Sequence, residues 1–206
     1  MRNMFDIVVD APPQMMRRMN DIHSHYFSID TADLTTFNEW YEFNPLILGH
    51  TVFKGESLGY YCILPITSEC AELFDQQAIK EEDLTSEHIV PREVMQHAKF
   101  AYIAAVAIMD MHDFTSRQCA AAMIAAIASH FTQDYDPQSL QRIYANPTTF
   151  DGNHMVHKLG LKPVVTLKKP LRGNDIYALD LDAETLAQFK HFSERYSRFI
   201  HQSPWK

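Results

Sequence analysis

The sequence predicts an α/β (α+β) fold with a mixed, mostly antiparallel central sheet, helices on both of its faces and an additional C-terminal helix. Segments rich in β-branched and aromatic residues alternate along the chain with segments whose apolar residues recur every three or four positions. Strands followed by packed helices are typical of a layered sheet. The apolar segment 101–109 is too continuous for a strand with one solvated face, so we place it at the sheet centre.

The first third of the chain is expected to contain one strand, two helices and a β-hairpin. "FDIVV" (5–9) has the composition of a short strand and is closed by two prolines. Apolar residues fall at helical spacing in 14–27 and 31–44, which predicts two amphipathic helices. The β-rich segments 46–53 and 58–66 flank the four residues KGES, a length that suits a hairpin loop.

The middle of the chain leads into and out of the central strand. A short helix is expected over 68–79, and the polar segment 80–99 then connects this helix to the central strand. An alanine-rich helix follows at 116–132, because alanine is the best helix former. The next strand, 140–147, ends at a proline, and we expect the sheet to be antiparallel at first and locally parallel around 100–146.

The last quarter of the layered domain contains one helix and two strands. The helix, 151–160, ends at a glycine, which is the usual residue just beyond a helix C-terminus. The strands, 162–169 and 174–181, form a final pair. We therefore expect residues 1–181 to make up one domain.

The final helix, 182–202, extends beyond this domain and begins with a capping signature at Asp182. Its apolar residues form one continuous stripe: Leu186, Phe189, Phe192, Tyr196, Phe199 and Ile200. Such a stripe packs either on the same domain or on a second copy of the chain. We therefore expect residues 182–206 to be a helical extension that covers the sheet or forms a homodimer contact.

Composition and charge exclude several classes of function. The net charge of −8 argues against a nucleic-acid-binding surface, which needs a basic stripe. The longest apolar run is about half of what a membrane span needs, and no secretory leader is recognisable, so we expect a cytoplasmic protein without a membrane partner. The three cysteines and the histidine pairs lack metal-ligand spacing, so we expect reduced thiols and no metal.

A polar turn joins the central strand to the alanine-rich helix in the segment MDMHDFTSRQCAAAMIAAIASHF (109–131). Strand, turn and helix N-terminus in this order are typical of a phosphate-binding site, although such a turn normally contains glycines and this one has none. From the residues alone, 116–122 fits either an anion site or an ordinary capped helix whose alanines pack closely on a sheet.

Over residues 5–181 the order of elements resembles that of the GNAT superfamily of acyl-CoA N-acyltransferases. Two segments carry the resemblance. The first, 101–131, lies in the place of the family's Gln/Arg-x-x-Gly-x-Gly/Ala motif, and its match is RQCAAA (117–122), in which both glycine positions hold alanine. The second, 147–164, is similar to the family's later helix and to the Leu-x-Lys-Leu-Gly-Phe sequence that ends it.

The resemblance implies that strands 101–109 and 140–146 run parallel and then splay, so that their backbone groups pair with the pantetheine arm of coenzyme A. It also implies that the pyrophosphate rests on the helix N-terminus, with Arg117 as a charged partner. An acyl-CoA, either acetyl-CoA or another, is then the co-substrate, and an unidentified amine is the acceptor. The residues assigned to the acyl-CoA are Val106, Ala107, Ile108, Arg117, Gln118, Cys119, Ala120, Ala121, Ala122 and Asn146.

The resemblance also implies catalytic residues. The tyrosine that often serves as the family's general acid falls at or next to Val156, which cannot donate a proton. His157 and Tyr144 are the candidates to replace it, and Asp110 is the candidate to accept a proton from the amine. The ordinary alternatives are an exposed helical histidine for His157 and a turn cap for Asp110. Two functions therefore stay open: an N-acyltransferase that works by direct attack, and a catalytically degenerate binding or regulatory module.

Overall fold

The computed structural model describes residues 4–27, 34–109, 114–136, 138–165 and 175–202. Its strands are β1 (Phe5–Val9), β2 (Leu48–Phe53), β3 (Glu56–Ile66), β4 (Phe100–Ile108), β5 (Arg142–Ala145), β6 (Lys162–Pro163), β7 (Tyr177–Asp180) and β8 (Ile200–Gln202). Its helices are α1 (Pro13–Tyr26), α2 (Leu34–Phe43), α3 (Ser68–Asp75), α4 (Phe114–Gln133), α5 (Phe150–Lys158) and α6 (Ala183–Tyr196). Short 3₁₀ helices connect them, among them η2 (Glu81–Asp83) and η5 (Ser197–Phe199).

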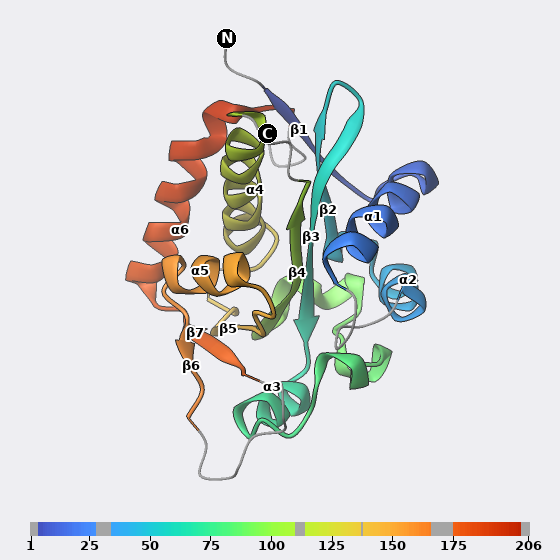
Figure 1. Cartoon of the computed structure of the whole chain (residues 1–206). Coiled ribbons are helices and arrows are strands. Elements are labelled where there is room, and N and C mark those ends of the chain that lie inside the picture. Colours follow the sequence, from blue (N-terminus) through green and yellow to red (C-terminus); the bar gives the residue numbers. More distant parts are fainter. Residues whose placement is uncertain (1–3, 28–33, 110–113, 137, 166–174, 203–206) are drawn as a thin grey trace.

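The strands form one sheet in the order β6-β7-β5-β4-β3-β2-β1-β8. Helices cover both of its faces: α4, α5 and α6 lie on one side, and α1 and α2 lie on the other (Figure 1). Each face has its own buried hydrophobic cluster, the first including Tyr61 and Phe131 and the second including Trp40 and Tyr102. The predicted class, a mixed sheet with helices on both faces, is confirmed.

The sheet is antiparallel except at two pairs of strands. Antiparallel pairing links β1, β2, β3 and β4, and again β5, β7 and β6. The parallel pairs are β4 with β5, and β1 with β8. All nine residues of β4 are buried or half-buried near the middle of the sheet, which is the place that its continuous apolar composition predicted.

The hairpin between β2 and β3 is tighter than the sequence suggested. The strands pair as far as Phe53 and Glu56, so the loop consists of Lys54 and Gly55 instead of four residues. Both loop residues have positive φ, 53° and 85°, which is typical of a type I′ turn. The twist of such a turn matches the twist of the strands, so pairing continues to its edge.

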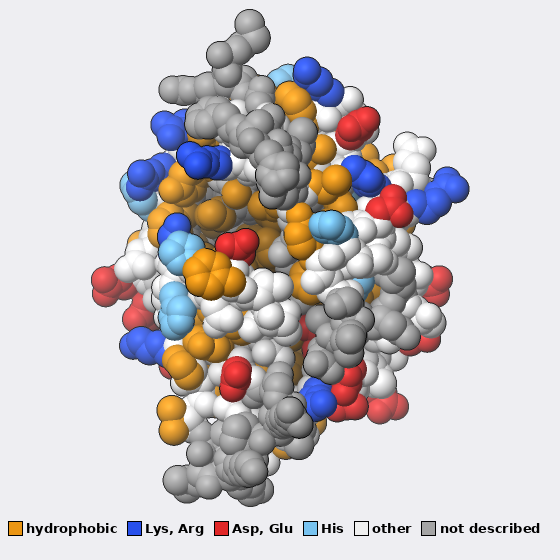
Figure 2. Space-filling view, viewed as in Figure 1, with side chains coloured by type: hydrophobic (Ala, Val, Ile, Leu, Met, Phe, Trp, Pro, Cys, Tyr) orange, Lys and Arg blue, Asp and Glu red, His pale blue; other side chains and the backbone are white. Residues whose placement is uncertain are grey.

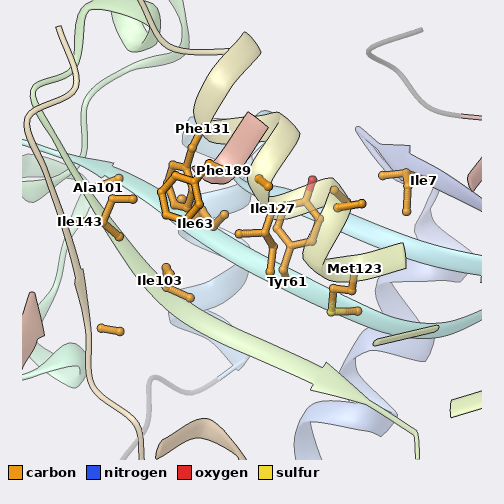
Figure 3. Close-up of a cluster of buried hydrophobic side chains, with 14 of the residues drawn as sticks. Ile7, Tyr61, Ile63, Ala101, Ile103, Met123, Ile127, Phe131, Ile143 and Phe189 are labelled. Carbon is orange, nitrogen blue, oxygen red and sulfur yellow. The ribbon is translucent and has the colours of Figure 1, made fainter. Parts of the chain in front are cut away.

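The C-terminal segment is helical over a shorter stretch than predicted. α6 ends at Tyr196, and the chain then forms η5 and the edge strand β8, in which Ile200 pairs with Phe5 of β1. α6 packs on α4 of the same chain: the rings of Phe189 and Phe131 stack with their centroids 5.8 Å apart. Figure 3 shows this pair beside Ile63 and Ile143 of the sheet. Beyond β6, residues 166–169 of the predicted strand 162–169 lie outside the described residues.

α4 lies close to the sheet because its inner face consists largely of alanine. Ala122, Ala125 and Ala126 have no exposed surface. A Cβ atom on Gly59 of β3 would approach both the Cε atom of Met123 and the carbonyl oxygen of Ala107 to 2.7 Å. Small side chains on both elements therefore allow the helix and the sheet to approach closely.

Candidate active site

The parallel strands β4 and β5 part halfway along β4. They pair only from Phe100 with Arg142 to Ile103 with Ala145, although β4 continues to Ile108. Pro147 follows β5 two residues later and has no amide hydrogen to continue the ladder. The second half of β4 therefore presents an edge beyond the end of its parallel partner.

A β-bulge in β4 lies at the point where the two strands separate. Cys62 of β3 pairs with Ala105, and Ile63 pairs with Ile103, so Ala104 is an extra residue on β4. A bulge bends its strand and increases the local twist. The bulge thus gives a physical reason why β4 diverges from β5.

Alternation along β4 identifies the backbone groups that reach the open edge. The amide of Met109 donates to the carbonyl oxygen of Leu58 in β3, at 2.8 Å. Because successive residues of a strand direct their polar groups to opposite neighbours, Val106 and Ile108 direct theirs away from β3. Ala107 directs its groups to Tyr60 in β3, so its backbone does not serve the open edge.

A pocket of about 50 Å³ occupies the space between the separated strands. Ile103 to Val106 form one wall, and Ala145 to Thr149 form the other. Gly152, Met155 and Val156 of α5 also line the pocket, and Phe27 and Glu81 contribute from other parts of the chain. The face seen in Figure 2 is hollowed beside α5, and hydrophobic side chains line the hollow.

The rim of the pocket is held by the start of α5. Thr149 caps this helix, and its Oγ1 accepts a hydrogen bond from the amide of Gly152 at 3.0 Å. A Cβ atom on Gly152 would lie 3.0 Å from the same oxygen, so the absence of a side chain lets the cap close. Asn153 adds a bond from Nδ2 to the carbonyl oxygen of Thr149 at 3.1 Å.

The motif predicted to bind phosphate does not lie at the start of its helix. α4 begins at Phe114, so the amides of Gln118 to Ala122 are bonded inside the helix to carbonyl groups four residues earlier. Gln118, Cys119 and Ala122 are also buried. Only the first turn of α4, up to Ser116, has amides outside the helical ladder. The amides of 118–122 therefore do not form a phosphate cradle.

The side chains near this motif differ in exposure. Arg117 is exposed, and Ala120 and Ala121 are half-buried. Burial raises the pKa of the Cys119 thiol to about 12. A hydrogen bond with Thr51 acts in the opposite direction, but its effect on this pKa is smaller than that of burial. A thiol with a raised pKa has little thiolate at neutral pH, so Cys119 has the character of a packing residue.

Of the predicted catalytic residues that the structure describes, Tyr144 and His157 do not line the pocket. Tyr144 lies in the cluster on the α1 face, where its hydroxyl donates to Oδ1 of Asp75 at 3.1 Å and burial raises its pKa. His157 is exposed on α5, with its ring 5.5 Å from that of Tyr177. Asp110 lies outside the described residues. Of the assigned residues, Val106 and Asn146 do line the pocket.

Glu81 is a pocket residue that the sequence did not assign to the site. It begins η2, in a segment that the sequence presents only as a polar connection, and its side chain is 5% exposed. The hydroxyl of Tyr102 on β4 donates to Oε2 of Glu81 at 2.6 Å. Three consecutive acidic residues normally indicate a solvated turn, so no local signal marks the first of them as buried.

Several polar side chains lie near Glu81 on the α1 face of the sheet. The charge of Glu81 adds to burial in raising the pKa of Tyr60, Cys62 and Tyr102. Tyr60 Oη lies 2.7 Å from Nδ1 of His23 on α1. Phe27, directly after α1, packs against His23 with the two rings tilted and their centroids 5.0 Å apart, and it lines the pocket.

No protein-family model matches the sequence, and no curated protein matches it. Solved structures match its fold. The loading GNATL domain of CurA from Lyngbya majuscula has a TM-score of 0.56 at 11% identity, over 92% of this chain and 100% of that one. The aminoglycoside acetyltransferase AAC(6')-Ib in complex with coenzyme A has a TM-score of 0.53 at 10% identity, over 90% and 99%. The CoA-dependent acyl-homoserine lactone synthase BjaI has a TM-score of 0.51 at 11% identity, over 98% and 93%.

The chain therefore has the GNAT fold, as the order of its elements predicted. The separation of β4 from β5 and the pocket beside α5 are the features of this fold that bear on function. Val156, at or next to which the resemblance places the family's general-acid tyrosine, lines the pocket.

Three further observations concern the described residues. None of their helices is both long enough and apolar enough to cross a membrane. Within the same ranges, no three histidine, cysteine, aspartate or glutamate side chains come together as a possible metal-binding group. Cys62, Cys70 and Cys119 are buried free thiols.

Proposed function

We propose that the protein is an acyl-CoA-dependent N-acyltransferase. The observation that carries this proposal is the open edge of β4, where Val106 lines a pocket beyond the end of β5. An extended ligand with amide groups can pair with such an edge through main-chain hydrogen bonds. The pantetheine arm of coenzyme A is such a ligand, and the gap between the two strands suits its slender shape.

The reaction we propose is direct attack by an amine on the thioester carbonyl inside the pocket. The backbone donor of Val106 at the open edge is placed to stabilise negative charge on the carbonyl oxygen. The narrow walls would hold the two reactants in one orientation, which supplies part of the rate enhancement. Because the pocket measures only about 50 Å³, we expect a short acyl group, with acetyl as the first candidate.

The first turn of α4 and the exposed side chain of Arg117 are the candidate partners for the phosphate groups. The first turn of a helix lies at the positive end of the helix dipole, which favours negatively charged groups. Arg117 adds a charged donor that can form paired bonds with a phosphate. This assignment replaces the amides of 118–122, which are bonded within the helix.

Calorimetric titration with coenzyme A, acetyl-CoA and a long-chain acyl-CoA tests the proposal. We expect binding in the micromolar range, with acetyl-CoA preferred over the long-chain donor. The variant Ala104→Leu should weaken binding, because Ala104 lines the pocket. The control Ala187→Leu makes the same change on the exposed face of α6 and should bind normally. Absence of binding at millimolar acetyl-CoA would remove the proposal.

A second candidate function is a binding or regulatory module on the same fold. It is favoured by Val156, at or next to which the resemblance places the family's general-acid tyrosine, and by the phosphate motif that lies inside α4. A module of this kind would bind coenzyme A without turnover. Multiple turnovers with any amine in a broad screen would exclude it.

A further inference from the structure

We propose that Arg18 of α1 binds the diphosphate group of the acyl-CoA at the end of β4. The inference rests on the proposed acyltransferase function. It adds to that function a phosphate-binding residue on the face of the sheet opposite α4, which the sequence did not assign. A side-chain cation from α1 thus replaces part of what the amides of 118–122 do not supply.

The open edge of β4 determines the direction in which the donor can lie. β5 pairs with β4 from Phe100 to Ile103, so an extended ligand finds a free edge only beyond that point. The pocket lies at the start of this free edge, and Val106 and Ile108 direct their backbone groups away from β3. A thioester in the pocket therefore places its pantetheine arm along Val106 and Ile108, and the diphosphate comes next, where β4 ends.

The guanidinium group of Arg18 lies at this end of the strand. Its Nη2 contacts Sδ of Met109, the residue directly after β4. Met109 is three residues beyond Val106, which is ~10 Å along an extended strand. Arg18 is therefore close to the part of the donor that carries its negative charge.

Arg18 has donors available for an anion. A guanidinium has five N–H donors, and the thioether sulfur of Met109 is only a weak acceptor. Among the described residues, the carboxylate paired with Arg18 is that of Asp21, with 3.8 Å between Nη1 and Oδ2. The side chain of Asp21 is 72% exposed, and such a surface ion pair contributes little. A diphosphate can form shorter, paired bonds with the same guanidinium.

The position of the phosphate motif explains why a cation from another helix is needed. The amides of 118–122 are bonded inside α4, and the chain has a net charge of −8. A diphosphate therefore needs local positive charge to bind. Arg117 is the candidate on α4, and α1 lies on the opposite face of the sheet (Figure 1). In the proposed complex, Arg18 and Arg117 approach the anion from opposite sides.

The adjacent residue provides a matched control. Arg17 is exposed on the same helix, whereas Arg18 is half-buried. Because a helix has 3.6 residues per turn, neighbouring side chains project about 100° apart. Replacing Arg17 therefore changes the net charge in the same way without removing the group that contacts Met109.

The first test measures binding by calorimetry of coenzyme A, of dephospho-coenzyme A, which keeps the diphosphate, and of pantetheine, which has no phosphate. Arg18→Met keeps an unbranched side chain beside Met109 but removes the charge. It should weaken binding of the two diphosphate ligands by roughly ten-fold or more, because a hydrogen-bonded charge pair is lost. Pantetheine binding should not change. The control Arg17→Met should bind all three ligands normally.

The second test uses charge, which a purely structural role of Arg18 would not affect. Binding of coenzyme A should weaken more steeply with added salt in the unaltered protein than in Arg18→Met, because salt screens the proposed contact. Asp21→Asn removes the carboxylate that competes with the diphosphate and should strengthen binding by up to about five-fold. In the Arg18→Met background the same change should have a smaller effect.

The outcomes separate the inference from the proposed function. If coenzyme A does not bind to the unaltered protein, the proposed function fails. If it binds and Arg18→Met binds it equally well with the same salt dependence, the assignment of Arg18 fails alone. An equal loss of affinity for coenzyme A and pantetheine would show that Arg18 only supports the fold. A raised KM for a carboxylate-bearing amine, with unchanged coenzyme A affinity, would place Arg18 at the acceptor. Either result would overturn the inference.

Discussion

The hydroxyl of Tyr102 donates a hydrogen bond to Oε2 of Glu81 at 2.6 Å and so joins the central strand β4 to the short helix η2 at the pocket. Both side chains are almost completely buried, at 0% and 5% exposure. The bond therefore matters for the stability of the protein.

The first prediction concerns the stability of this pair. Glu81→Ala leaves the Tyr102 hydroxyl buried without this acceptor, and an unsatisfied buried donor costs about 1–3 kcal/mol. We expect the free energy of unfolding, measured in urea, to fall by at least this amount. Glu81→Gln keeps an acceptor oxygen and should lose less. Equal losses in the two variants would contradict this account.

The second prediction concerns the cap of α5 at the pocket rim. Thr149→Ala removes the acceptor of the Gly152 amide and should lower the free energy of unfolding by about 1 kcal/mol. It should also weaken acetyl-CoA binding several-fold, because the rim of the pocket loses its anchor. Calorimetry and urea unfolding measure the two effects.

Asp182→Ala is the matched control for the cap. Asp182 caps α6, accepting from the amide of Thr185 at 2.8 Å, and α6 does not line the pocket. This variant should lose stability but bind acetyl-CoA as the unaltered protein does. If both cap variants weakened binding equally, the rim would have no special role.

The third prediction is a loss of stability in acid that depends on His50. This side chain has no exposed surface, its Nδ1 lies 3.1 Å from Oγ of Ser57, and burial lowers its pKa from 6.5 to about 4. Below pH 6.5 the unfolded chain binds a proton at this position before the folded chain does. The stability from the neutral ring is therefore present above pH 6.5 and is lost as the pH falls toward 4, by at most about 3 kcal/mol.

Urea unfolding between pH 7 and pH 4.5 measures this dependence. His50→Asn should have a shallower loss of stability across that range than the unaltered protein. His154→Asn, an exposed position on α5, should leave the slope unchanged. A slope in His50→Asn as steep as in the unaltered protein would assign the acid sensitivity to other groups.

The fourth prediction concerns the attachment of the C-terminal helix. Phe189 is 3% exposed and stacks on Phe131, so Phe189→Ala should cost about 3–5 kcal/mol in the free energy of unfolding. Phe192→Ala, at a half-buried position on the same helix, should cost less. Light scattering should give the same mass for both variants and for the unaltered protein, because Phe189 packs within its own chain.

Periodicity along the sequence was sufficient to predict most elements of the fold. The continuous apolar segment at 101–109 predicted a central strand, and β4 is buried or half-buried throughout. The helical spacing of 14–27 and the glycine at 160, which has a φ of 87°, predicted α1 and the end of α5. These features depend on neighbours within a few residues, so local sequence contains the information.

The sequence was less informative about the site. The resemblance pointed to Val106 and Asn146, which line the pocket, and also to Tyr144 and the amides of 118–122, which do not serve it. A strand pattern indicates that side chains alternate, but not which cluster each face will join.

The sequence by itself determined the order of most strands and helices, because turn residues and apolar spacing act over a few positions. Only the tertiary structure decided where β5 stops while β4 continues, that β8 pairs with β1, and that Glu81 is enclosed beside Tyr102. These contacts join residues far apart in the chain. They form because packing of the whole domain lowers the free energy, and no single segment encodes them.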